Sequence, residues 1–204
     1  MCNSYLIVFV KNLEKGKVKT RLGKVVGDEN ALLVYQKLLK HTADQTQQLM
    51  CKKVVFYSES IEKKDLWLEG VYTKALQVGK TLGERMKNAF AFCFEQGADR
   101  VMVIGSDCPE LSQSIIEEAF DRLESYDTVI GPAADGGYYL LGLNKPVPEL
   151  FENIQWSTSS VLKDSLNILH KKNLSNYQLP VLSDLDTVED LKRYADYYQL
   201  VKKK

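Results

Sequence analysis

Short apolar runs alternate along this chain with longer segments in which apolar residues recur every three or four positions. Runs of four to six apolar residues, rich in β-branched and aromatic side chains, are typical of buried strands. Apolar residues spaced at helical intervals are typical of helices that pack on one face. Strands and helices in alternation predict an α/β protein with a mainly parallel sheet.

Strands are expected where apolar runs are bounded by turn residues. The clearest runs are at 5–10, 54–57, 101–104, 128–130 and 138–143, with weaker extended segments at 71–72 and 179–182. The first run is expected to be a central strand, and 179–182, which contains a proline, an edge strand. The runs at 128–130 and 138–143 have no helix between them, so a mixed sheet with at least one antiparallel strand is expected.

Helices are expected between these strands, over about 28–50, 61–68, 82–94, 115–123 and 157–171. A last helix is expected to begin at Asp186 or Thr187 and to end near residue 198, before a frayed basic tail at 202–204. Residues 11–24 are expected to form a loop. No internal repeat or linker interrupts the pattern, so residues 1–204 are expected to form a single domain.

The composition argues against some classes of protein. Hydrophobic residues make up 45% and charged residues 26% of the chain, and Lys+Arg and Asp+Glu are both 27, so the net charge is zero. This balance argues against a nucleic-acid partner and against binding to an anionic membrane surface. No apolar run is long enough to span a membrane, and the four cysteines show no metal-binding spacing. A cytoplasmic protein with reduced thiols is expected. The oligomeric state, monomer or homodimer, stays open.

The loop at 11–24 is strongly basic: six lysine or arginine residues against one glutamate give a charge of +5. A cationic, glycine-containing loop directly after a first strand suits an anion such as a di- or triphosphate. Arg21 can bind phosphate oxygens through two N–H groups, and Lys19 as a point charge. The alternative is an ordinary solvated loop. The loop is not a P-loop, because the G-x-x-x-x-G-K-[ST] pattern is absent.

Carboxylates follow three of the expected turns. Asp107 comes directly after the buried run 101–104, Asp135 lies before Gly136 and Gly137, and Asp186 precedes the last helix. Ligands of open α/β sheets bind beyond the carboxyl ends of the strands, and Mg²⁺ typically takes one or two carboxylates plus substrate phosphates. For Asp186 the alternative is a helix N-cap, and for Asp135 an ordinary turn residue. Cys108, beside Asp107, is interpreted as a small packed residue and not a nucleophile.

Five motifs, in order, resemble a group of GT-A-like transferases related to 2-phospho-L-lactate guanylyltransferase and other members of the nucleotide-diphospho-sugar transferase superfamily. The first is a K-x-P-x-x-G-x-V-K-T-R-L pattern at 11–22, in which Leu13 replaces the proline. The others are L-G-x-R-M at 82–86, G-x-D-C-P-x-L at 105–111, G-P-A-x-D-G-G-Y-Y at 131–139 and D-x-D-T-x-x-D-L at 184–191. The likeness covers nearly the whole chain and implies a Rossmann-like GT-A fold, a mixed, mostly parallel sheet flanked by helices.

The resemblance also implies roles for individual residues. Asp107 and Asp186 are expected to bind Mg²⁺ or Mn²⁺, with Lys19, Arg21 and Asp107 as the catalytic residues. The nucleotide and its phosphates are expected at Lys11, Gly16, Lys19, Arg21, Gly79, Gly83 and Arg85. The acceptor is expected at Asp135, Gly136, Gly137 and Tyr138, where the glycines would allow close approach.

The expected activity is metal-dependent transfer from a nucleotide substrate to a small-molecule acceptor. Nucleotidyl transfer from a nucleoside triphosphate is favoured, since the dense cationic loop suits a triphosphate. The acceptor would be a small phosphorylated or hydroxylated molecule. Two alternatives remain: glycosyl transfer from a nucleotide-sugar, because one fold can host both reactions, and a non-catalytic nucleotide-binding protein.

Overall fold

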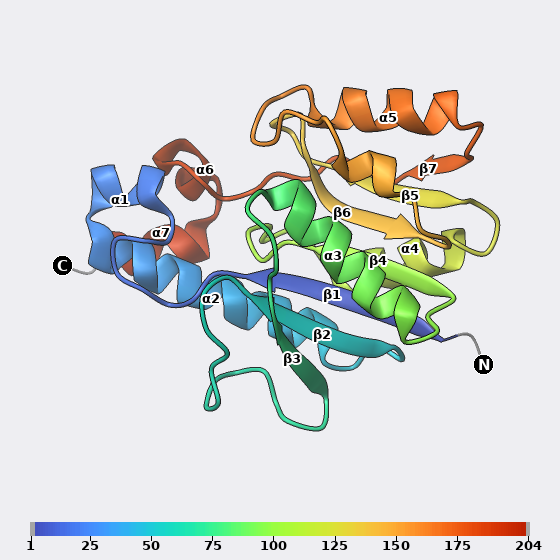
Figure 1. The fold of residues 1–204 in the computed structure, drawn as a ribbon. Coiled ribbons are helices and arrows are strands. Elements are labelled where there is room, and N and C mark those ends of the chain that lie inside the picture. Colours follow the sequence, from blue (N-terminus) through green and yellow to red (C-terminus); the bar gives the residue numbers. More distant parts are fainter. Residues whose placement is uncertain (1–2, 203–204) are drawn as a thin grey trace.

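A single seven-stranded sheet forms the centre of the molecule (Figure 1). The structure is a computed structural model that describes residues 3–202. Its strands are β1 (Ser4–Val10), β2 (Lys52–Tyr57), β3 (Tyr72–Leu76), β4 (Arg100–Ile104), β5 (Thr128–Pro132), β6 (Tyr138–Leu143) and β7 (Asn176–Gln178). They lie in the order β3-β2-β1-β4-β6-β5-β7, so β1 is an interior strand, beside β4 at the centre of the sheet. Strand β6 runs antiparallel to both β4 and β5, and the other pairs are parallel.

Helices cover both faces of this sheet. They are α1 (Thr20–Val26), α2 (Asp28–Thr46), α3 (Leu82–Glu95), α4 (Gln113–Arg122), α5 (Val161–Lys171), α6 (Val188–Arg193) and α7 (Ala195–Lys202), with a short 3₁₀ helix η1 (Pro148–Phe151). Successive side chains of a strand point to opposite faces. In β1, Leu6 and Val8 pack against the core beneath α2, α4, α6 and α7, whereas Tyr5 and Ile7 pack against α3, η1 and α5. The predicted α/β class with a mixed, mostly parallel sheet is confirmed.

Several segments differ from the sequence-based expectation. Residues 61–68 form an irregular loop, because the Asp65 carboxylate accepts hydrogen bonds from the Tyr57 hydroxyl and from the backbone N–H of Trp67. Both contacts, together with burial of the Trp67 indole, compete with a helix. In the predicted loop at 11–24, residues from Thr20 onward form α1, which buries Leu22 against α2.

The C-terminal part also differs. The edge strand is β7, and 179–182 contributes only a single bridge, between Leu182 and Ala133. The helix expected from Ser157 begins at Val161, and the last helix is interrupted at Tyr194 into α6 and α7. Within residues 3–202 no helix is both long and apolar enough to cross a membrane. Lys203 and Lys204 of the expected basic tail lie outside the described residues.

The structure shows which of the two candidate residues, Asp186 or Thr187, caps α6. Thr187 is the N-cap, and its hydroxyl accepts a hydrogen bond from the backbone N–H of Asp190. The Asp190 carboxylate accepts in turn from the backbone N–H of Thr187, which completes a capping box. Asp186 therefore does not cap the helix, and its carboxylate is free for another contact.

Candidate functional site

A cleft with two lobes opens at the carboxyl ends of the parallel strands. The first lobe has a volume of about 510 Å³, and its wall includes Lys11, Ser58, Gln77 and Gly105, the residues that directly follow β1, β2, β3 and β4. The second lobe, of about 430 Å³, is lined by the start of α1. Residues common to both lobes are Lys11, Tyr35, Asp107, Asp135, Ser157, Thr158 and Asp186. The cleft therefore lies where ligands of open α/β sheets bind.

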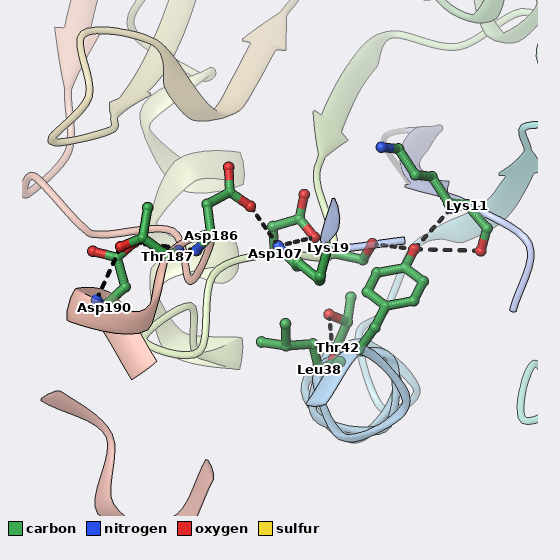
Figure 2. Close-up of polar contacts among 10 residues, drawn as sticks. Lys11, Lys19, Leu38, Thr42, Asp107, Asp186, Thr187 and Asp190 are labelled. Atoms are coloured by element: carbon green, nitrogen blue, oxygen red, sulfur yellow. Dashed lines mark hydrogen bonds and ion pairs between the residues drawn. The ribbon is translucent and has the colours of Figure 1, made fainter. Parts of the chain in front are cut away.

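Two of the predicted carboxylates meet at the junction of the lobes. Asp107 follows β4, Asp186 precedes α6, and the Nζ of Lys19 lies 2.8 Å from an oxygen of each (Figure 2). The side chain of Lys19 is only 3% exposed, whereas those of Asp107 and Asp186 are 44% and 47% exposed. Burial alone would lower the pKa of Lys19, but the two carboxylates raise it above its ordinary value. The ammonium therefore contacts the carboxylates, which differs from the phosphate contact expected of Lys19.

Tyr35 fixes the floor of the cleft between β1 and β4. Its hydroxyl accepts a hydrogen bond from the backbone N–H of Lys11, at 2.8 Å, and lies 3.2 Å from the hydroxyl of Ser106. Burial, with a further contribution from Asp107, raises the pKa of Tyr35 to about 12, so the phenol stays neutral at physiological pH. Tyr35 thus links the first residue of the basic loop to the residue before Asp107.

The basic loop delivers fewer free cations to the cleft than its charge of +5 predicts. Lys15 and Lys17 form exposed ion pairs with Glu29 and Glu14, and Lys19 is held by the aspartates. Lys11 and Arg21 line the cleft, and within residues 3–202 neither of their side chains forms an ion pair. Lys24, the sixth cation of the loop, lies in α1 and lines neither lobe. Lys11 and Arg21 are therefore the cations of the loop placed to contact a bound phosphate.

Arg85 lines the first lobe as part of a fixed polar group. Its Nε donates to the carbonyl of Gly79, and one of its Nη atoms donates to the side-chain oxygen of Gln77. The Gln77 amide nitrogen donates to the carbonyls of Val10 and Phe56, which sets the orientation of this side chain. An apolar lobe with one preorganised polar end suits a nucleotide base.

The side of the cleft predicted to bind the acceptor contains a second segment. Asp135, Gly137 and Tyr138 line the cleft, and Trp156, Ser157 and Thr158 lie in the same wall. Ser157 has φ 64, a left-handed backbone conformation that non-glycine residues rarely adopt. The Tyr138 hydroxyl is buried and has no hydrogen-bond partner within residues 3–202. Ser157 and Thr158, which are exposed, therefore carry the hydroxyl groups of this wall that a ligand can reach.

Four of the glycines assigned to ligand binding lie outside the walls of both lobes. Gly16 and Gly79 have positive φ, 79° and 134°, and form turns. Gly83 and Gly136 allow close approach within the protein. A Cβ on Gly83 would lie 2.4 Å from Nε1 of Trp156, and one on Gly136 would lie 2.3 Å from the carbonyl oxygen of Ser159. The missing side chains thus make room for residues 151–159, and not directly for a ligand.

Two further titratable groups lie beside the carboxylates. Burial, reinforced by the charge of Asp107, raises the pKa of Asp184 to about 7. Burial also raises the pKa of the Cys108 thiol to about 12, which disfavours a thiolate and supports its interpretation as a packed residue.

The carboxylate pair suits a divalent metal that takes its other ligands from a substrate. Asp107 and Asp186 each contact Lys19 through one oxygen, and in Figure 2 their other oxygens point to the same side, away from the ammonium. Among the described residues, no cluster of three or more His, Cys, Asp or Glu side chains could enclose a metal. Two carboxylates completed by phosphate oxygens and water are typical of Mg²⁺ sites.

Comparison with known proteins places the chain in a family. Residues 41–158, more than half of the chain, match the family model DUF2064, described as an uncharacterized protein conserved in bacteria. The chain belongs to this DUF2064 family. Among curated proteins, none matches the chain.

Solved structures share the fold. One, from Desulfovibrio desulfuricans G20, is provisionally assigned as a nucleotide-diphospho-sugar transferase. The two sequences are 35% identical, the match covers 99% of this chain and 95% of the Desulfovibrio chain, and the TM-score is 0.89. 4-Diphosphocytidyl-2C-methyl-D-erythritol synthase from Anaerococcus prevotii has 11% identity, covers 97% and 96% of the two chains, and has a TM-score of 0.61. Glucosyl-3-phosphoglycerate synthase from Mycobacterium tuberculosis has 12% identity, covers 98% and 77%, and has a TM-score of 0.57. These neighbours are transferases, and the predicted GT-A-like family and fold are confirmed.

Sequence reasoning missed several residues of the cleft. Gln77 follows a weak strand, and Tyr35 looks like one more apolar position of a long helix. Ser157 and Thr158 were assigned to the start of a helix. The available signal was the hydroxyl-rich run at 157–160, directly after Trp156.

The packing role of Gly83 predicts a specific loss of stability. Gly83→Ala places a Cβ against Trp156 and Phe151, and overpacking of this kind typically costs about 1–3 kcal/mol. Urea unfolding measures the effect. Gly105→Ala is the control, since no atom lies within 4 Å of its added Cβ, and should change stability by less than about 0.5 kcal/mol. Equal stabilities of the two variants would contradict the packing role.

The raised pKa of Asp184 predicts a pH-dependent stability. Below about pH 4 the Asp184 carboxyl is protonated in both the folded and the unfolded chain. As the pH rises toward 7, this carboxyl ionises freely only in the unfolded chain, so the folded protein loses stability. Asp184→Asn should therefore gain stability over the wild type between pH 5 and pH 8, on the order of 1–3 kcal/mol, measured by urea unfolding.

Asp127→Asn serves as the control for this measurement. A hydrogen bond with Lys145, and further ones with Ser175, lower the pKa of Asp127 to about 2, so its contribution is lost only in acid, well below pH 5. Its stability difference from the wild type should be the same at pH 5 and pH 8. A flat profile for Asp184→Asn would show that this carboxyl does not titrate in that range.

Proposed function

We propose that this chain is a single-domain, metal-dependent nucleotidyltransferase that uses a nucleoside triphosphate. The observation that carries the proposal is that one cleft at the strand ends holds two half-exposed carboxylates together with two cations, Lys11 and Arg21, for which residues 3–202 supply no ion-pair partner. Asp107 and Asp186 supply the metal ligands, and Lys11 and Arg21 the phosphate contacts. The neighbouring glucosyl-3-phosphoglycerate synthase structure, a complex with Mn²⁺ and UDP, supports a divalent metal and a nucleotide in this fold.

The first lobe is assigned to the nucleoside. Its apolar wall, with residues such as Phe9 and Met86, packs against the base, and the group of Arg85 and Gln77 contacts its polar edge. The triphosphate then extends across the carboxylates into the second lobe, where Lys11 and Arg21 hold the terminal phosphates. When bound, a divalent metal on Asp107 and Asp186 neutralises charge on the phosphates and on the leaving group.

The acceptor is assigned to the wall formed by the 135–138 turn and by Ser157 and Thr158. An oxygen of the acceptor attacks the α-phosphorus, a new P–O bond forms, and the bond to the bridging oxygen breaks to release pyrophosphate. Lys11 and Arg21 stabilise the negative charge that develops on this leaving group. No covalent enzyme intermediate is required, because positioning and electrostatics supply most of the catalysis.

Pyrophosphate release tests the reaction. The protein is incubated with each of the four nucleoside triphosphates, Mg²⁺ or Mn²⁺, and fractions of small metabolites as acceptors, and one nucleotide should yield pyrophosphate. Asp107→Asn should lower this rate by at least about 100-fold, because a metal ligand is lost. Asp44→Asn, on the exposed face of α2, should retain the wild-type rate.

Other outcomes of the same assay favour the alternatives. The solved structure at 35% identity, provisionally a nucleotide-diphospho-sugar transferase, keeps glycosyl transfer as a second candidate. Consumption of nucleotide-sugars alone, with release of a nucleoside diphosphate, would establish that reaction. Nucleotide binding without turnover, and full cellular function of Asp107→Asn, would instead indicate a non-catalytic nucleotide-binding protein.

The position of Arg21 in the cleft predicts that its loss weakens nucleotide binding more than the loss of a paired cation of the same loop. Arg21→Gln should raise the KM for the nucleotide about tenfold or more, since a charge-assisted contact to phosphate is lost. Lys15→Gln removes an equal charge from the same loop, but Lys15 is paired with Glu29 outside the cleft and should leave the KM unchanged. Equal effects of the two changes would show that only the overall charge of the loop matters.

A further inference from the structure

A buried lysine, Lys19, forms ion pairs with both Asp107 and Asp186. Lys19 is the N-cap of α1 and has φ 47, a left-handed backbone conformation. Its side chain runs inward, with 3% exposed, and its Nζ lies 2.8 Å from one oxygen of Asp107 and 2.8 Å from one oxygen of Asp186. Nearly complete burial distinguishes Lys19 from Lys11, whose side chain is in the exposed part of the loop.

The net charge of Lys19, Asp107 and Asp186 determines how strongly they attract a metal ion. Two carboxylates and one ammonium sum to −1, and one oxygen of each carboxylate is already used. A divalent ion on the remaining oxygens would lie close to a fixed positive charge that is shielded from water, where Coulomb repulsion is only weakly screened. The phosphates of a nucleotide would supply the negative charge and the oxygen ligands that the pair lacks.

We propose that Lys19 is a positioning residue that holds the two carboxylates together and prevents them from binding a divalent metal alone, so that metal enters together with the phosphates of the nucleotide. The second half of this statement rests on the proposed function, and the first half does not. In the free protein, the Lys19 ammonium offsets the repulsion between the Asp107 and Asp186 carboxylates, which a metal ion would otherwise have to do. It does so without contacting the substrate.

Manganese binding tests the first half without any nucleotide. The wild type, Lys19→Met and Lys15→Met are titrated with Mn²⁺, and free Mn²⁺ is followed by electron paramagnetic resonance. Lys19→Met should bind one Mn²⁺ at least about tenfold more tightly than the wild type, because the fixed positive charge is gone. Lys15→Met, which removes a cation paired with Glu29, should match the wild type. Equal Mn²⁺ affinity of the wild type and Lys19→Met would overturn the proposal.

Thermal unfolding covers the case in which Lys19→Met folds poorly. Two carboxylates left without their ammonium repel one another, so the Tm of this variant should rise on addition of Mn²⁺ alone. Lys19→Arg keeps the charge and should show no such rise. For the wild type, the Tm should rise with Mn²⁺ plus a nucleoside triphosphate and not with Mn²⁺ alone, and a rise with Mn²⁺ alone would contradict the proposal.

The two proposals fail in different ways. Tight Mn²⁺ binding by the wild type without nucleotide, with pyrophosphate release intact, would reject the role of Lys19 and leave the nucleotidyltransferase proposal standing. Absence of turnover with every nucleotide, with Mn²⁺ binding gained in Lys19→Met, would reject that reaction and leave the role of Lys19 in the carboxylate pair standing.

Discussion

The contact on which the rest of the site depends is the bridge from Lys19 to Asp107 and Asp186. It joins three segments far apart in the sequence: the start of α1, the turn after β4 and the residue before the N-cap of α6. A buried ammonium needs a paired anion, and a cation between two adjacent carboxylates offsets their mutual repulsion. Each partner therefore requires the others, and the C-terminal segment is held against the sheet where it completes the cleft. A backbone hydrogen bond from Leu185 to the carbonyl of Asp107 supports the same arrangement.

The antiparallel strand β6 brings the second wall to this site. Because β6 runs opposite to β4, its first residue, Tyr138, lies at the same end of the sheet as the carboxyl end of β4. The turn before it is anchored by backbone hydrogen bonds from Ala134 to Leu182 and from Leu162 to Gly136. A fully parallel sheet would have placed a helix between β5 and β6 and moved this turn to the opposite edge. The mixed topology thus gives one cleft two chemically different sides.

Those two sides are consistent with a reaction between a nucleotide and a second molecule. One side offers an apolar lobe with a fixed polar end and two free cations, and the other offers hydroxyl groups on a tightly packed loop. Residues 151–159 approach α3 and the turn before β6 closely, since Gly83 and Gly136 lack the side chains that would keep them at a distance.

The sequence alone was sufficient for the fold class, for most strands, and for the identity of the two key carboxylates. Apolar periodicity is a local property, and Asp107 follows a strand whose direction fixes its place at the ligand-binding edge. The missing crossover helix between 128–130 and 138–143 likewise revealed an antiparallel strand.

Only the tertiary structure decided how the charges pair. The sequence of the basic loop suggests a single phosphate site, but Lys15, Lys17 and Lys19 pair with carboxylates. Lys19 pairs with two that are distant in sequence, Asp107 and Asp186. Of the other three cations, Lys11 and Arg21 line the cleft and Lys24 does not. The glycines of the family motifs were predicted to contact a ligand, yet Gly83 and Gly136 accommodate residues 151–159, which come later in the chain. Pairing and close approach depend on distances between segments that the order of residues does not encode locally, and for that reason they could not be predicted.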